Sequence, residues 1–131
     1  MHLGYIIIYV ADVPKTVTFY ETAFALKRRF VHESSLYAGM ETSGTTLAFA
    51  GTAAARMTGL AIRPNDPKQV AADWEVCLLT DDVAAAYRQA VAKGYNPVTP
   101  PTEKPWGQTV CYVRDLNGCL VEIASPIEGK A

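Results

Sequence analysis

Two glutamates, Glu75 and Glu122, are the residues whose type and position most readily suggest chemistry. Each lies in a short segment that is otherwise apolar, Glu75-Val-Cys-Leu-Leu79 and Leu120-Val-Glu-Ile-Ala124. A carboxylate in apolar surroundings is unfavourable unless it is paired, hydrogen-bonded or protonated, and crowding of two carboxylates raises the pKa of one of them. Such a pair could act as general base and acid, could ligate a metal, or could only bond a neighbouring hydroxyl or guanidinium group.

A proline-rich stretch ahead of Trp106 predicts a rigid loop that presents an indole and an amide. Four prolines between residues 97 and 105 restrict the backbone before Trp106 and Gln108. We expect Trp106 to stack on a ligand and Gln108 to bind it, although plain loop packing would explain the same residues. The sequence contains no Gly-rich phosphate loop, no G-x-S-x-G motif and no recognisable catalytic triad.

The cysteines and histidines form no metal-binding or disulfide pattern. Cys77, Cys111 and Cys119 lack C-x-x-C spacing, and three thiols cannot all pair within one chain. We therefore predict buried free thiols, of which Cys77 shares a strand face with Glu75. His32 is predicted to lie at the surface of a strand.

The first half of the chain predicts the order β-α-β-β-β. A β-branched and aromatic run predicts the first strand, and Asp12 is suited to cap the helix that follows. Short segments separated by Ser and Gly residues then predict a three-strand meander. The predicted ranges are 5–10 for the first strand, about 14–25 for the helix, and 29–33, 35–41 and 45–50 for the meander.

The second half repeats the same order. A strand at 74–80 leads to a helix that Asp82 would cap and Gly94 would end, followed by strands at 95–98, 108–113 and 119–124. Asp12 and Asp82 are 70 residues apart, so two copies of one module are the simplest explanation. We predict one duplicated domain over 1–131, with modules at 3–50 and 73–126 and a linker at 51–72.

The composition narrows the class of protein. The 131 residues include 12 Lys and Arg and 13 Asp and Glu, which gives a formal charge of −1, and half are hydrophobic. This balance argues against a nucleic-acid partner, and the longest apolar run, Tyr5 to Ala11, is too short to span a bilayer. No basic and apolar leader begins the sequence, so we expect a cytoplasmic globular protein without a membrane partner.

The duplicated order and two segments resemble the vicinal oxygen chelate superfamily. The segments are Tyr5-Ile-Ile-Ile-Tyr-Val-Ala-Asp-Val13 and Val113-Arg-Asp-Leu-Asn-Gly-Cys-Leu-Val-Glu-Ile123. The superfamily includes glyoxalase I, bleomycin-resistance proteins, fosfomycin-resistance enzymes and extradiol dioxygenases. The resemblance implies an α+β fold in which two βαβββ modules form an eight-stranded, incompletely closed curled sheet around a pocket. It also suggests a homodimer.

Metal-using members carry one ligand on each of four strands, and the resemblance places these positions at Tyr5, Ala48, Glu75 and Glu122. Only Glu122 has the usual residue type. Glu75 could ligate through oxygen, Tyr5 is a weak ligand and Ala48 has no donor atom. No cofactor is therefore predicted firmly. A divalent metal, if bound, would be held by Glu75 and Glu122.

Strand alternation indicates which side chains line the implied pocket. The neighbours of Tyr5, Glu75 and Glu122 on the opposite strand face are uniformly apolar, as expected beneath a packed helix. The mixed face should then line the pocket, with Glu75 and Glu122 as the candidate catalytic residues. The residues predicted to contact a ligand are Tyr5, Tyr9, Ala48, Cys77, Trp106, Gln108 and Tyr112.

Two functions fit this pattern. The favoured hypothesis is a protein of the glyoxalase and bleomycin-resistance type that binds a small organic molecule in an aromatic pocket without a tightly held metal. The alternative is a metal-dependent or metal-free lyase, isomerase or dioxygenase of the same superfamily, with Glu122 and Glu75 as ligands or general base. The sequence leaves open whether the protein is an enzyme.

Overall fold

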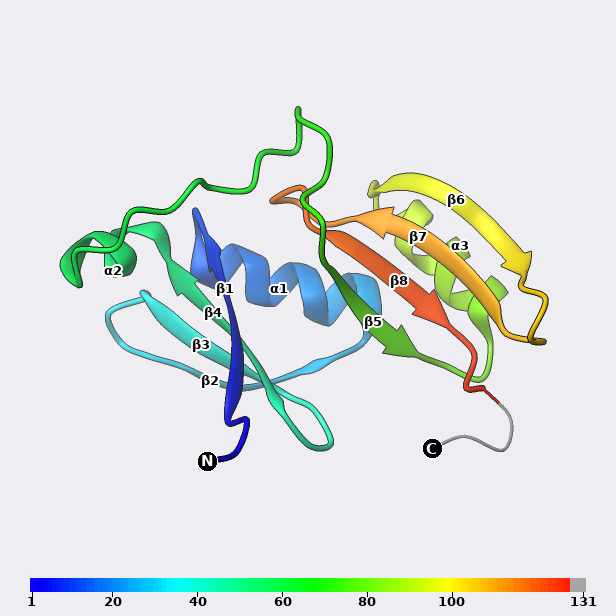
Figure 1. The fold of residues 1–131 in the computed structure, drawn as a ribbon, viewed down its shortest axis with the longest axis horizontal. Helices are drawn as coiled ribbons and strands as arrows, with labels where there is room; N and C mark the ends of the chain where they lie inside the picture. The colour runs from blue at the N-terminus through cyan, green and yellow to red at the C-terminus, as the bar shows by residue number, and fades with distance from the viewer. Residues whose placement is uncertain (128–131) are drawn as a thin grey trace. The chain divides into compact units, whose positions relative to one another are not determined.

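The computed structural model describes residues 1–127, and the chain divides into two compact units, Met1–Asn65 and Asp66–Ala131 (Figure 1). Each unit contains one β-α-β-β-β series, so the predicted α+β fold with two βαβββ modules is confirmed. The elements of the first unit are β1 (Tyr5–Val10), α1 (Val13–Phe24), β2 (Lys27–Val31), β3 (Tyr37–Glu41), β4 (Thr46–Gly51) and α2 (Thr52–Met57). Those of the second are β5 (Glu75–Leu79), α3 (Val83–Ala92), β6 (Asn96–Glu103), β7 (Thr109–Arg114) and β8 (Leu120–Ala124).

Both units use the same sheet topology. The strand order is β1-β4-β3-β2 in the first sheet and β5-β8-β7-β6 in the second, and neither sheet closes into a barrel. In each, the first and last strands of the unit pair in parallel, whereas the other neighbours are antiparallel. The shared topology lets positions in one sheet be matched with positions in the other.

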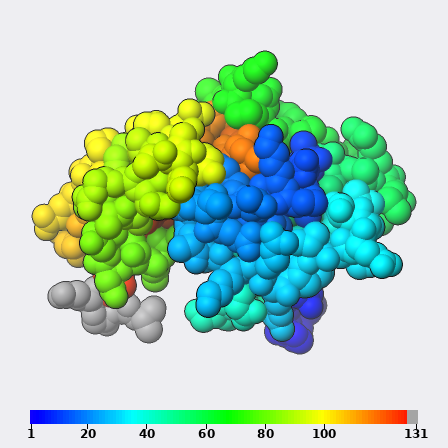
Figure 2. All heavy atoms as spheres, turned by 180° about the vertical axis from the view of Figure 1, so that it is seen from behind, coloured from blue at the N-terminus to red at the C-terminus, as the bar shows by residue number. Residues whose placement is uncertain are grey.

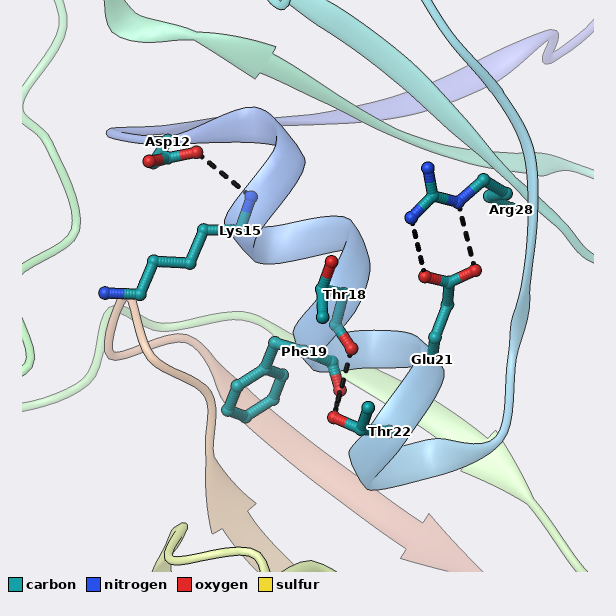
Figure 3. Close-up of polar contacts among 7 residues, drawn as sticks. All are labelled: Asp12, Lys15, Thr18, Phe19, Glu21, Thr22 and Arg28. Atoms are coloured by element: carbon teal, nitrogen blue, oxygen red, sulfur yellow. Dashed lines mark hydrogen bonds and ion pairs between the residues drawn. The ribbon is translucent and has the colours of Figure 1, made fainter.

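Both long helices begin where the sequence predicts. The side chain of Asp12 accepts a hydrogen bond from the backbone N–H of Lys15 at 3.0 Å (Figure 3), and Asp82 accepts one from Ala85 at the same distance. Each aspartate thereby satisfies a backbone donor that the first helical turn would leave unpaired. Gly94, with φ of +84°, follows the last turn of α3 and allows the chain to leave the helix.

The helices bury different kinds of side chain. α1 packs Val17 and Tyr20 against its sheet, and the Tyr20 ring lies 4.9 Å from that of Phe49 in β4. α3 contributes only smaller buried residues, Val83 and Ala90. The apolar residues that the sheets bury on the helix side include Ile8, Phe49, Cys111, Val113, Val121 and Ile123.

The solvent side of α1 is polar. Lys15 and Thr18 are exposed. Figure 2 shows atoms of the N-terminal part of the chain, in blue, at the surface. Glu21 forms an ion pair with Arg28 at 2.9 Å (Figure 3), which ties the helix to the start of β2 and lowers the pKa of the Glu21 carboxyl. Within residues 1–127, no helix has the length and apolar character needed to cross a membrane.

Three local predictions were wrong. The segment 52–57, assigned to a linker, forms the short helix α2. β6 continues through Pro100 and Pro101 to Glu103, because an edge strand with register shifts tolerates residues that lack an N–H. His32 is exposed, as expected, but it follows β2 in a turn, where its Nδ1 accepts a hydrogen bond from the backbone N–H of Ser34 at 3.1 Å.

Residues 58–74 contain no helix or strand, but their second half is held in place by the second unit. The Arg114 guanidinium donates to the backbone carbonyls of Asp66, Pro67 and Gln69 at 2.7–3.2 Å. It also donates to the carbonyl of Gly118 at 2.8 Å and 3.0 Å. A Cβ added at Gly118 would lie 2.7 Å from the backbone of Pro67, so only glycine permits this contact.

Candidate functional site

Three side chains form a row across the second sheet. The register places Cys77 of β5 beside Glu122 of β8, and Glu122 beside Tyr112 of β7. Directly paired residues point to the same face of a sheet, so all three project from the face opposite α3. The parallel and antiparallel pairings thus bring together residues that are up to 45 positions apart in the sequence.

Tyr112 and Glu122 are hydrogen-bonded. The Tyr112 hydroxyl donates to Oε2 of Glu122 at 3.2 Å, and both residues are half-buried. Partial burial, together with the negative charges of Glu122 and Glu75, raises the pKa of the Tyr112 hydroxyl to about 12. Tyr112 therefore stays protonated at neutral pH and acts as a hydrogen-bond donor to the carboxylate.

Glu75 is the second acid of this cluster. It pairs with Leu120, two residues before Glu122 in β8, so Glu75 and Glu122 lie on the same face of the sheet. Loss of solvation and the neighbouring Glu122 carboxylate raise the pKa of Glu75 to about 7, although the residue as a whole is exposed. A carboxyl with such a pKa can accept or release a proton near neutral pH.

Cys77 is exposed, so the prediction of buried thiols is correct for Cys111 and Cys119 and wrong for Cys77. The difference arises because β5 is an edge strand and Cys77 lies on the face that no helix of its unit covers. Desolvation and the charges of Glu122 and Glu75 raise the pKa of the Cys77 thiol to about 11. The thiol is therefore protonated at neutral pH and is a poor nucleophile.

Trp106 and Gln108 lie in the connection between β6 and β7. The Trp106 indole N–H donates to Oε1 of Gln108 at 2.9 Å, and Nε2 of Gln108 donates to the backbone carbonyl of Ser125 at 2.9 Å. Trp106 is 59% exposed, whereas Gln108 is half-buried. The two predicted ligand contacts thus differ: Trp106 presents a free ring, and the amide of Gln108 is engaged within the protein.

The equivalent face of the first sheet is apolar and aromatic. Ala48, which corresponds to Glu122, is fully buried between Ile7 and Gly39 in the strand register. A Cβ at Gly39 would lie 3.0 Å from Cε1 of Phe30, so the Phe30 ring covers the position that Tyr112 occupies in the second sheet. The strand register places Tyr5, Tyr9 and Tyr37 on this face as well.

Both the fold and the sequence match one protein family. The family model described as "Glyoxalase/Bleomycin resistance protein/Dioxygenase superfamily" matches residues 2–123. The chain belongs to this superfamily. A search of curated proteins found no match to the sequence.

Several solved structures share the fold. A glyoxalase-related enzyme from Fulvimarina pelagi has a TM-score of 0.80 at 20% identity, over 96% of this chain and 88% of that one. A glyoxalase/bleomycin resistance protein/dioxygenase family enzyme from Burkholderia phytofirmans PsJN has a TM-score of 0.81 at 17% identity, over 95% and 98%. TioX from Micromonospora sp. ML1 has a TM-score of 0.70 at 20% identity, also over 95% and 98%.

The four metal-ligand positions expected from the superfamily do not provide a fitting donor set. Ala48 has no donor atom, and Tyr5 would have to ligate as a phenolate. That leaves Glu75 and Glu122, of which Glu75 holds its proton up to about neutral pH. Among residues 1–127, no three or more His, Cys, Asp and Glu side chains gather closely enough to bind a metal ion.

The sequence did not point to Phe30 or Arg114. An irregularity in the β2–β3 register between Arg28 and Phe30 changes the alternation, so the face of Phe30 could not be read from the spacing. The carbonyl partners of Arg114 lie 45 to 48 residues away, and backbone carbonyls leave no trace in the sequence pattern.

Proposed function

We propose that this protein binds a small organic molecule against aromatic side chains, without a tightly held metal. The observation that carries the proposal is the row Ile7, Ala48 and Gly39 with Phe30 over it, where the superfamily expects a metal ligand at Ala48. A face made of apolar side chains, small residues and aromatic rings favours burial and stacking of an apolar ligand. It offers no Lewis acid of its own.

Exposure of the first sheet supports the same function. Phe30 is 42% exposed and its ring lies 5.6 Å from that of Tyr37, while Tyr5 and Ile7 are also exposed. Large apolar side chains gathered on one face mark a surface that a ligand can cover favourably, because burial of apolar area lowers the free energy. An aromatic pocket, a cytoplasmic location and a homodimer remain predictions from the sequence.

Binding of proflavine, a planar aromatic probe, tests this function. We expect the reduced protein to bind it, and Phe30→Ala to weaken binding by about tenfold, the effect of losing one stacking contact. Leu60→Ala, at an exposed apolar residue outside the sheet, is the matched control and should leave the affinity unchanged. Elemental analysis of the same preparation should find no stoichiometric metal. A stoichiometric metal that survives dialysis would contradict the proposal.

An acid–base enzyme is the second candidate, and the position of Glu75 beside Glu122, with the raised pKa of Glu75, favours it. A carboxyl with a pKa near 7 is suited to donate or accept a proton at physiological pH. If the protein turns over a substrate, we expect Glu122→Gln to lower the turnover rate at least about a hundredfold. Carbon NMR titration should show the Glu75 pKa falling only part of the way toward 4.5 in this variant, because the burial effect remains. Full activity in Glu122→Gln would exclude this role.

A further inference from the structure

The amide of Gln108 connects the Trp106 indole to the end of the second sheet. An indole N–H can only donate a hydrogen bond, and a backbone carbonyl can only accept one. The chain of bonds from Trp106 Nε1 to Gln108 Oε1, and from Gln108 Nε2 to the Ser125 carbonyl, therefore fixes the amide in one orientation. Each end of the amide thus has a partner within the protein.

The loop that carries Trp106 is itself ordered by short bonds. The backbone N–H of Lys104 donates to the Gln108 carbonyl at 2.7 Å, and that of Gly107 donates to the Lys104 carbonyl at 2.9 Å. Gly107 adopts a φ of +85°, which the turn requires and which other residues rarely adopt. The backbone beside the turn is thus fixed before any side chain is considered.

Ser125 is an equally firm anchor. Its hydroxyl accepts a hydrogen bond from the backbone N–H of Thr109 at 2.9 Å, and its own N–H donates to the Thr109 carbonyl at 2.9 Å. The Gln108 amide therefore attaches the indole to a residue that already extends the pairing between β7 and β8. Such a connection restricts the rotamer of a side chain that would otherwise move freely in solvent.

The indole is largely exposed despite this support. Trp106 is 59% accessible, and its only polar atom is already bonded to Gln108. What it offers to a partner is the face of a large aromatic ring, which stacks on planar conjugated rings. Because the ring is held before binding, a ligand does not have to bear the entropy cost of ordering it.

We propose that Gln108 is a positioning residue that holds Trp106 as a preformed stacking surface for a planar conjugated ligand. This inference rests on the proposed function for its ligand, but the link between Gln108 and Trp106 can be tested without one. It assigns Gln108 a role different from the direct ligand contact that the sequence predicts.

The experiment uses the full chain with Trp74→Phe, which leaves Trp106 as the only tryptophan. In this background, Gln108→Met keeps the length of the side chain and removes both hydrogen bonds. We expect lower fluorescence anisotropy of Trp106 and an acrylamide quenching constant about twofold higher, because the ring gains nanosecond motion. Proflavine affinity should fall about fivefold, which corresponds to the loss of about one hydrogen bond. Gln89→Met, at an exposed glutamine of α3, is the control.

Each outcome decides part of the proposal. Unchanged anisotropy and quenching in Gln108→Met would overturn the positioning role, provided that circular dichroism shows a folded protein. Changed anisotropy with unchanged proflavine affinity would overturn the stacking role. If Phe30→Ala weakens proflavine binding and Gln108→Met does not, the proposed function stands and this inference fails. If proflavine does not bind the parent protein, ligand stacking fails, whereas the quenching data still decide whether Gln108 positions the ring.

Discussion

The two sheets use one backbone pattern to present opposite chemistry. In the first sheet the central row reads Ile7, Ala48, Gly39, with Phe30 over the glycine. The matching row of the second sheet reads Cys77, Glu122 and Tyr112. The first row can only pack against apolar groups, whereas the second holds a hydroxyl, a thiol and a carboxylate beside Glu75.

This difference teaches that the topology does not determine the chemistry of the face. Each module places a small number of side chains on the side opposite its helix, and those side chains differ without a change in strand order. The same fold can therefore hold different functional residues at equivalent positions. The central row is apolar in the first module and polar in the second.

The largest expected effect tests whether the helix sides of the sheets also differ. Phe49→Ala should lower the free energy of unfolding by about 4 kcal/mol, because it removes a ring that packs on Tyr20 under α1. Ile123→Ala, at the matching position of β8, should cost about 3 kcal/mol, since the side chain is smaller. Urea denaturation measures both. A larger loss for Ile123→Ala would reverse the comparison of the two cores.

A second comparison concerns Arg114 and its counterpart in the first sheet, Glu41. Arg114 donates to carbonyls of residues 66–69, whereas Glu41 is exposed and makes only a loose ion pair with Arg29 at 3.9 Å. We expect Arg114→Ala to lower the free energy of unfolding by about 1–2 kcal/mol. Glu41→Ala should change it by no more than about 0.5 kcal/mol.

Limited trypsin digestion reports on the same contact. The bond after Lys68 lies in the segment that Arg114 holds, so Arg114→Ala should speed cleavage there while Glu41→Ala does not. Mass spectrometry locates the cut. Equal cleavage rates in both variants would show that the guanidinium does not hold this segment.

The smallest expected effect is the pH dependence that Glu75 contributes, because this carboxyl is exposed and solvent screens its charge. Its pKa is about 7 in the folded protein and 4.5 is its ordinary value, so the folded state binds the proton more tightly between these values. The contribution to stability is present below pH 4.5 and is lost as the pH rises through about 7. The melting temperature of Glu75→Gln should therefore fall less than that of the parent protein between pH 5 and pH 8.

Glu33→Gln provides the matched control in the first unit, because it removes an exposed carboxylate. It should keep the pH dependence of the parent protein in a calorimetric series at pH 5, 6, 7 and 8. If Glu75→Gln behaves like Glu33→Gln, the pKa of Glu75 is not raised in the folded protein.

The sequence alone determined features that rest on neighbours along the chain. Asp12 and Asp82 cap their helices as predicted, because a cap requires only an acceptor three residues before a backbone N–H. Strand alternation likewise placed Glu75 and Cys77 on one face, since that period depends on the backbone of a single strand. The doubled β-α-β-β-β order follows from such local signals.

Only the tertiary structure decided which of these residues meet. The register brings Tyr112 to Glu122, a bulge sets the face of Phe30, and the bonds of Gln108 and Arg114 end on distant backbone carbonyls. Such contacts depend on how strands align and where loops return, and they involve groups that every residue carries. The sequence therefore indicated the glutamates of the site, whereas the fold decided that the Trp106 indole donates to Gln108 and that the Tyr112 hydroxyl donates to Glu122.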